Sequence, residues 1–183
     1  MKERPILFNA EMVRAILAGK KTQTRRPVKP QPRGDIVDFS ARHYTRTKSG
    51  ARCRGYDSGY VCVPVRCPYG VPGDLLWVRE RINRRHAIWN DLSGATYDAD
   101  LSAVMGTGPD GSYLGRALCY WQWQRDFLPS IFMPRWASRI NLEITDMQVE
   151  QATEPDDAAK TYDTGDWVWV VEFKVIRGAA DPA

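Results

Sequence analysis

Apolar residues near the N-terminus recur at helical spacing. They are Met12, Val13, Ile16 and Leu17. Intervals of three and four residues predict an amphipathic helix over residues 9–17. Asn9 suits the N-cap of this helix, and Gly19 can adopt the positive φ that ends it. The chain after Gly19 is therefore expected to leave the helix through a tight turn and to open a strand.

Two segments near the C-terminus carry the strongest strand patterns. Residues 140–145 alternate between apolar and polar side chains, which predicts a half-buried strand. Met147 and Val149 fall out of this alternation, so we expect a β-bulge near Thr145. Residues 167–176 are almost wholly apolar and are rich in β-branched and aromatic side chains. They predict a central strand with both faces buried.

Further strands are predicted at residues 75–80 and, as a short element, at residues 120–123. A short helix is predicted at residues 154–160. Two polar segments, residues 33–66 and 84–128, contain many turn-forming residues and are expected to be long loops. Few helices and several separated strands predict an α+β, mostly β fold. We expect a small β-barrel with one or two packed helices and long loop insertions.

Length and composition narrow the class of protein. The chain has 183 residues, of which 43% are hydrophobic, so it can build a real core and is too apolar to be disordered. We expect a single domain over residues 1–183. No apolar run is long enough to span a bilayer, and charges interrupt the N-terminus before a secretory signal can form. We therefore predict a cytoplasmic protein without a membrane partner, whose four cysteines are reduced thiols.

Positive charge is concentrated in the N-terminal third. Residues 1–54 carry 14 Lys and Arg against 4 Asp and Glu, whereas residues 141–183 carry 3 against 10. The basic stretch, residues 19–26, holds four cationic side chains. Like charges this close repel one another, and a phosphate, a nucleotide or an acidic partner would relieve the repulsion. The alternative is that the acidic C-terminal third folds back and neutralises them.

The sequence lacks the residues that several other kinds of site would need. Cys62 and Cys67 are separated by four residues, no Cys-x-x-Cys pair occurs, and the two histidines are His43 and His86. This pattern predicts no metal site and no triad of nucleophile, histidine and carboxylate. The chain also has no Gly-x-x-x-x-Gly-Lys phosphate loop, and no cofactor is expected.

The basic stretch reads Gly19, Lys21 and Arg26 at the spacing Gly-x-Lys-x-x-x-x-Arg, with Thr24 between them. It resembles the pattern Gly-x-Lys-x-x-Glu-x-Arg of the ASCH domain, in which Thr24 takes the glutamate position. Other matching pieces are residues 6–9, 67–70, 72–74, 76–80, 133–139 and 167–170. Together they look like ASCH proteins of bacteriophages and prophages, which implies a bacterial host cell. The resemblance implies a PUA-like β-barrel with a cleft beside the helix-to-strand turn.

The resemblance also implies a chemistry to consider. Some small ASCH proteins are amidohydrolases that remove the acyl group from N4-acetylcytidine with a lysine, a threonine and a glutamate. The first two roles carry over onto Lys21 and Thr24 as candidate catalytic residues. The matching glutamate position falls near Thr161 or Tyr162, where no glutamate stands. The candidate substitute carboxylates are Glu80 and Glu154.

PUA-like domains commonly bind RNA or modified bases, and this chain has residues suited to that task. The candidate phosphate contacts are Lys20, Arg25, Arg26, Lys29 and Arg135. Tyr69 and Trp136 are candidates for stacking on an unpaired base, whereas Trp77 is expected in the core. We therefore predict binding of RNA, a nucleotide or a modified nucleoside through a basic cleft. The alternatives are deacylation of acylated cytidine and an accessory role in which the chain binds a host protein.

Overall fold

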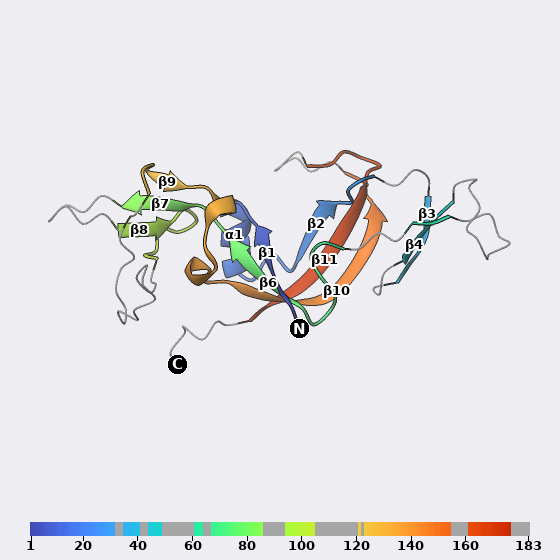
Figure 1. Cartoon of the computed structure of the whole chain (residues 1–183), viewed down its shortest axis with the longest axis horizontal. Helices are drawn as coiled ribbons and strands as arrows, with labels where there is room; N and C mark the ends of the chain where they lie inside the picture. Colours follow the sequence, from blue (N-terminus) through green and yellow to red (C-terminus); the bar gives the residue numbers. More distant parts are fainter. Residues whose placement is uncertain are drawn as a thin grey trace. The chain divides into compact units, whose positions relative to one another are not determined.

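The computed structural model of the chain is α+β and mostly β, as the sequence predicts (Figure 1). The structure describes residues 1–31, 35–40, 44–48, 61–63, 67–85, 94–104, 121, 123–154 and 161–176. Its α-helix, α1, spans Ala10–Leu17, and its longest strands are β10, Asn141–Gln151, and β11, Trp167–Ile176. The predicted helix and both predicted C-terminal strands are therefore confirmed.

Nine shorter strands and two 3-10 turns complete the described elements. The strands are β1 Glu3–Leu7, β2 Gln23–Pro27, β3 Asp35–Ser40, β4 Tyr44–Lys48, β5 Val61–Val63, β6 Leu75–Arg79, β7 Ile82–Arg85, β8 Gly94–Tyr97 and β9 Phe127–Leu128. The 3-10 turns are η1 Ser130–Phe132 and η2 Arg135–Ala137. β6 confirms the predicted strand at residues 75–80, and β2 is the strand that the basic stretch opens.

The expected β-barrel is wrong, because the described sheets are open. The largest sheet has the strand order β1-β6-β10-β11-β2, and two three-stranded sheets have the orders β3-β4-β5 and β8-β7-β9. A barrel requires its first and last strands to pair. Here both end strands of the large sheet contain a proline, Pro5 in β1 and Pro27 in β2. Proline has no N–H to donate to a ladder, so it suits an edge strand.

The two predicted loops also contain strands. β3, β4 and β5 fall within residues 33–66 and pair antiparallel, and β8 and β9 fall within residues 84–128 and pair with β7. Conversely, Trp121 and Trp123 of the predicted strand at residues 120–123 lie outside the assigned strands. Most of the short helix predicted at residues 154–160 lies outside the described residues.

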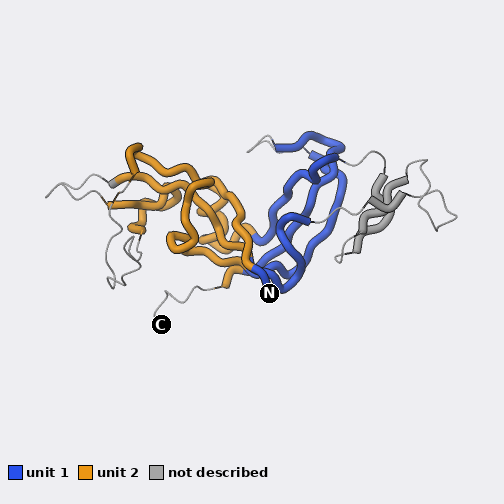
Figure 2. Tube along the Cα trace, in the orientation of Figure 1, with its two compact units in different colours: residues 1–2, 22–75, 143–174 blue, residues 3–21, 76–142, 175–183 orange. Residues whose placement is uncertain are grey.

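The chain divides into two compact units, each assembled from separate segments (Figure 2). Unit 1 comprises residues 1–2, 22–75 and 143–174, and unit 2 comprises residues 3–21, 76–142 and 175–183. The basic stretch is divided between them, because the boundary falls between Lys21 and Thr22. The expected single domain over residues 1–183 stays a prediction.

In unit 1 the pairing of β11 with β2 fixes the orientation of the basic stretch. β11 runs antiparallel to β2, with Val171 opposite Thr24 and Trp169 opposite Arg26. The consecutive residues 168–171 are all buried, which confirms that both faces of this part of β11 are covered. Because directly opposed residues share a face, Thr24 and Arg26 lie on one side of β2, and Arg25 lies on the other.

A turn at residues 67–74, also in unit 1, is fixed by a buried carboxylate. The backbone N–H of Lys2 donates to Oδ1 of Asp74 at 2.8 Å, and that of Val71 donates to Oδ2 at 3.4 Å. Gly70 has φ +120°, a conformation that glycine adopts at little cost. A Cβ at that position would lie 2.9 Å from Oδ2 of Asp74, so the turn needs glycine there for space as well.

In unit 2 the helix α1 begins and ends as predicted. The backbone N–H of Met12 donates to the side chain of the N-cap Asn9 at 2.8 Å, and Gly19 follows the helix with φ +68°. Of the predicted apolar stripe, Val13 and Ile16 are buried, whereas Leu17 is about half exposed. The buried face is therefore narrower than the pattern predicts.

Unit 2 also contains a hydrophobic core cluster around β7, β8 and the two 3-10 turns. Its buried members are Ile82, Ala95, Tyr97, Val104, Leu128, Met133 and Ala137. Trp121 and Trp123 pack against it, with ring centroids 4.8 Å apart in an edge-to-face arrangement. The hydroxyl of Tyr97 donates to the carbonyl oxygen of Ala137 at 2.7 Å, which ties β8 to η2. This cluster anchors η2, the 3-10 turn that carries Arg135 and Trp136.

Candidate functional site

The cations of the basic stretch do not form one cluster. Arg25 donates from Nε to Oε1 of Glu150 at 2.8 Å, and the two side chains are 42% and 43% exposed. Glu150 belongs to the acidic C-terminal third, so that third does neutralise part of the basic stretch. Arg26 lies on the other face of β2, where Thr24 is buried. The two neighbouring arginines therefore have different surroundings and are suited to different tasks.

Tyr69, a candidate for stacking, lies within electrostatic range of Arg26. Burial raises the pKa of the Tyr69 hydroxyl above its usual value, and the positive charge of Arg26 offsets part of that rise. Tyr69 comes from the turn at residues 67–74, and Arg26 comes from β2. Two predicted ligand-binding residues that are 43 positions apart in the chain thus interact electrostatically within unit 1.

The remaining candidates near this stretch differ in exposure. Lys20 and Lys29 are exposed, Lys21 is half-buried, and Glu154 is exposed. Lys21 belongs to unit 2 and Thr24 to unit 1, so the expected pairing of these two candidate catalytic residues stays a prediction. Neither Thr161, which is exposed, nor Tyr162, which is half-buried, supplies the carboxylate of the family pattern.

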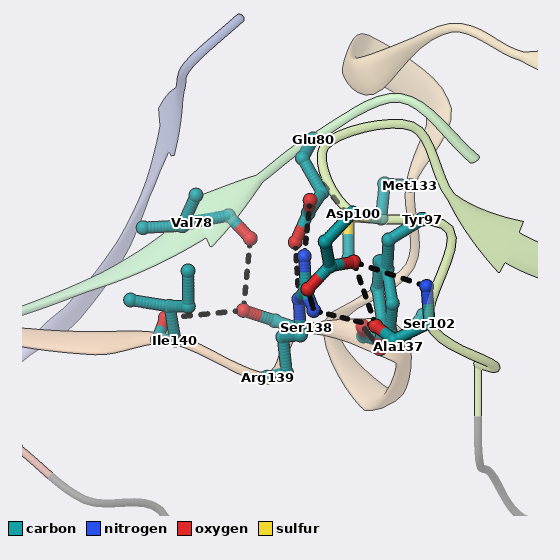
Figure 3. Close-up of polar contacts among 10 residues, drawn as sticks. All are labelled: Val78, Glu80, Tyr97, Asp100, Ser102, Met133, Ala137, Ser138, Arg139 and Ile140. Atoms are coloured by element: carbon teal, nitrogen blue, oxygen red, sulfur yellow. Dashed lines mark hydrogen bonds and ion pairs between the residues drawn. The ribbon is translucent and has the colours of Figure 1, made fainter. Parts of the chain in front are cut away.

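Glu80 is a buried carboxylate that lies in unit 2 and is bound by Arg139 (Figure 3). Nε of Arg139 donates to Oε1 of Glu80 at 2.8 Å, and Nη2 donates to Oε2 at 2.9 Å. The Glu80 side chain is only 2% exposed. This bidentate geometry is the strongest that an arginine and a carboxylate can form. Both oxygens of Glu80 are therefore used in the protein's own ion pair.

The same arginine joins a second carboxylate and an aromatic ring (Figure 3). Nη1 of Arg139 donates to Oδ2 of Asp100 at 2.7 Å and to the hydroxyl of Ser102 at 2.7 Å. Its guanidinium carbon lies 3.9 Å from the ring centroid of Tyr97. The sequence analysis identified Glu80 but not Arg139 or Asp100, because nothing local links residues so far apart in the chain.

The two carboxylates of this network have opposite pKa shifts. Burial raises the pKa of Glu80, and the hydrogen bonds and charge of Arg139 reverse only part of that rise. Burial also acts to raise the pKa of Asp100, but hydrogen bonds from Arg139 and Ser102 outweigh it, and the pKa falls below its usual value. Asp100 is therefore held in the charged form, whereas Glu80 is partly drawn toward the neutral form.

Replacement of Asp100 by asparagine is expected to remove part of the loss of stability in acid. Because the folded-state pKa of Asp100 is lowered, its contribution to stability is present above its unfolded pKa and is lost as the pH falls through the folded-state pKa. The stability difference between the wild type and Asp100→Asn should therefore shrink as the pH falls below about 4 in urea unfolding. The raised pKa of Glu80 has the opposite sign, and the charge of Asp100 contributes to it, so the substitution also lowers the Glu80 pKa and offsets part of this change. A difference that is constant with pH would contradict the prediction.

Arg135 and Trp136 both lie in unit 2, within the 3-10 turn η2. Arg135 donates from Nε to Oε2 of Glu3 at 3.1 Å and from Nη2 to the side-chain oxygen of Asn141 at 3.0 Å. Its guanidinium carbon is 5.6 Å from the ring centroid of Trp77, which is buried as expected. Trp136 is 42% exposed, so its ring is accessible for stacking.

The described residues contain no group of three histidine, cysteine, aspartate or glutamate side chains that could hold a metal ion. Cys67, in the turn of unit 1, is not part of a disulfide. Within the part of the chain that the structure describes, no helix has the length and apolar character needed to cross a membrane. Comparisons with protein-family models, with curated proteins and with solved structures found no match.

Proposed function

We propose that this chain is a phage-type ASCH protein of the PUA-like superfamily and that it binds RNA, a nucleotide or a modified nucleoside. The observation that carries the proposal is the electrostatic interaction of Tyr69 with Arg26, which lies on the same face of β2 as Thr24. A half-buried aromatic residue that interacts electrostatically with a guanidinium matches the two parts of a nucleotide, a base with a π face and an anionic phosphate. The proposed site is formed by the residues Arg26 and Tyr69 and lies within unit 1.

Binding is better supported than deacylation. A catalytic threonine must reach the acyl carbon of its substrate, whereas Thr24 is only 2% exposed and lies opposite Val171 in the β2–β11 pair. A substitute carboxylate would have to orient a lysine, whereas both oxygens of Glu80 accept hydrogen bonds from Arg139. Acetate release from N4-acetylcytidine that is abolished by Lys21→Ala would reverse this preference.

Arg26→Ala is expected to weaken binding about tenfold or more, because a hydrogen bond to a charged group contributes about 1.5–3 kcal/mol. The assay is titration of the purified protein with cytidine monophosphate and with a short oligouridylate at low salt. Loss of one phosphate contact should also reduce the salt dependence of oligouridylate binding by about one unit of slope.

Arg25→Ala is the matched control, because it removes the same charge from the neighbouring position on the other face of β2. Its effect on binding should be small, since Arg25 is already paired with Glu150. Equal losses in the two variants would mean that net charge governs binding, and the Arg26–Tyr69 site would then be rejected. Failure of cytidine monophosphate and of oligouridylate to bind in low salt would reject the nucleotide proposal itself.

A further inference from the structure

Unit 2 presents exposed aromatic rings next to arginines, at a place that the proposed nucleotide site does not include. The rings belong to Phe127, Phe132 and Trp136, and the nearby cations are Arg79, Arg81 and Arg135. These six residues are termed the aromatic–arginine surface. Phe132 is 68% exposed, and its neighbour Ile131 is 56% exposed. Ile131 and Phe132 are adjacent in the chain, and neighbouring exposed apolar side chains are typical of binding surfaces.

Direct contacts anchor the arginines of this surface. Nη1 of Arg79 donates to the carbonyl oxygen of Ile131 at 3.1 Å, and its guanidinium carbon lies 4.5 Å from the ring centroid of Trp77. Arg135 approaches the same ring. The guanidinium carbon of Arg81 lies 4.3 Å from the ring centroid of Phe127. The arginines are therefore held by rings and backbone, so little side-chain freedom remains to be lost on binding.

The 3-10 turns hold the exposed rings in place. η1 and η2 each follow a proline, Pro129 and Pro134, and Met133 between them is buried in the unit 2 cluster. Phe132 and Trp136 flank this buried methionine in the sequence, so both rings stand on an anchored segment. Rings that are fixed before a ligand arrives bind at a low entropic cost.

The charge of this surface determines what it suits. Arg135 is paired with Glu3, but among the described residues neither Arg79 nor Arg81 is paired with a carboxylate. The surface therefore attracts an anion and also offers flat rings. Single-stranded nucleic acid has both features at a short repeat, since each nucleotide supplies one phosphate and one base with a π face. An acidic peptide supplies the charge but only scattered rings.

We propose that the aromatic–arginine surface binds unpaired bases of single-stranded nucleic acid, with Trp136 and Phe132 as stacking residues and Arg79 and Arg81 as phosphate contacts. This inference shares its ligand class with the proposed function, but it rests on unit 2 residues alone. It identifies the ligand as a strand rather than a free nucleotide. Sequence preference is expected to be weak, because every base has a π face.

The test measures binding of fluorescein-labelled oligothymidylate and oligouridylate to the full chain. Both oligonucleotides have about 12 nucleotides, which is within the site size of single-strand binding surfaces. Trp136→Ala and Phe132→Ala are each expected to weaken binding about tenfold, while Trp136→Phe retains most of the affinity because it keeps a ring. Leu17→Ala is the matched control, since it removes a comparably exposed apolar side chain of unit 2 from another element. It should leave binding unchanged.

An abasic strand of the same length separates stacking from charge attraction. Wild type and Trp136→Ala should bind the abasic strand equally, because it offers phosphates but no bases to stack. Wild-type affinity for base-containing strands in both alanine variants would overturn the inference. The inference would also be overturned if Trp136→Ala lost as much affinity for the abasic strand as for the base-containing strand. Displacement of the strand by polyglutamate at matched charge would overturn it too, because that result would identify an acidic protein as the partner.

The outcomes also distinguish this inference from the proposed function. Arg26→Ala tests binding of cytidine monophosphate at unit 1, whereas Trp136→Ala should leave binding of that mononucleotide unchanged. If cytidine monophosphate does not bind but strand binding depends on Trp136, the proposed nucleotide site fails and the strand surface stands. If cytidine monophosphate binds through Arg26 and strand binding ignores Trp136 and Phe132, the reverse holds.

Discussion

Glu80→Ala is expected to lower the free energy of unfolding by about 3–5 kcal/mol, the usual cost of removing one partner of a buried ion pair. The substitution leaves the guanidinium of Arg139, whose side chain is only 20% exposed, without two of its hydrogen bonds. It also leaves a space beside Met133, whose sulfur accepts a hydrogen bond from the backbone N–H of Glu80. Urea unfolding of wild type and variant at neutral pH measures the difference.

Glu150→Ala provides the control for this prediction. It removes a glutamate that is also paired with an arginine, but both partners are far more exposed than Glu80 and Arg139, so the expected loss is at most about 1 kcal/mol. Glu80→Gln should fall between the two, since it keeps the shape of the side chain and loses the charge. A cost for Glu80→Ala no larger than that for Glu150→Ala would mean that the Arg139 network does not stabilise unit 2.

Gly70→Ala is expected to cost more than about 2 kcal/mol, because it combines backbone strain with a steric conflict. The new Cβ would lie 2.9 Å from Oδ2 and 3.1 Å from Cβ of Asp74. Asp74 cannot easily move away, since its carboxylate accepts hydrogen bonds from the backbone of Lys2 and of Val71. Thermal unfolding followed by circular dichroism provides the measurement.

Gly73→Ala separates the two causes. Gly73 also has a positive φ, +89°, but a Cβ there would meet no atom within 4 Å. Its substitution therefore carries backbone strain alone, and the expected cost is about 1 kcal/mol. If both variants lose the same stability, the contact with Asp74 contributes nothing, and the close approach of Gly70 to that carboxylate is not a constraint on the sequence.

Local sequence patterns predicted the helix and the strands whose own side chains carry a clear signal. The helix α1 was predicted by its spacing and by its N-cap Asn9, and β11 by an almost wholly apolar run that no amphipathic pattern would contain. Burial in β10 also shifts phase as expected, from Leu142 and Ile144 to Met147. In each case the residues whose pattern predicts the element lie within that element or a few residues from it.

Strands in polar segments were missed for the opposite reason. Residues 33–66 are rich in charge and turn formers, and this composition outweighed the β-branched residues of β4 and β5, Thr45, Thr47, Val61 and Val63. Those residues were the available signal, since β-branched side chains favour strands. The closure of a barrel was a larger error, because it depends on which strands meet at the ends of a sheet, and no local pattern reports that.

The candidate site was predicted residue by residue but not in its pairings. Sequence reasoning identified Arg26, Tyr69 and Glu80 individually. It did not predict that Arg26 interacts electrostatically with Tyr69, or that Arg139 binds Glu80 across 59 positions. It also treated Arg25 and Arg26 as equivalent, although a strand directs neighbouring side chains to opposite faces. That alternation could have been applied as soon as the basic stretch was predicted to open a strand.

The prolines in the two end strands of the large sheet have a consequence for the behaviour of the protein at high concentration. An open sheet exposes the backbone of its outer strands, and such an edge can capture a strand from another molecule and start aggregation. Pro5 and Pro27 interrupt the row of N–H groups that an incoming strand would need. The chain thus carries a built-in defence against self-association at both ends of this sheet, which a closed barrel would not require.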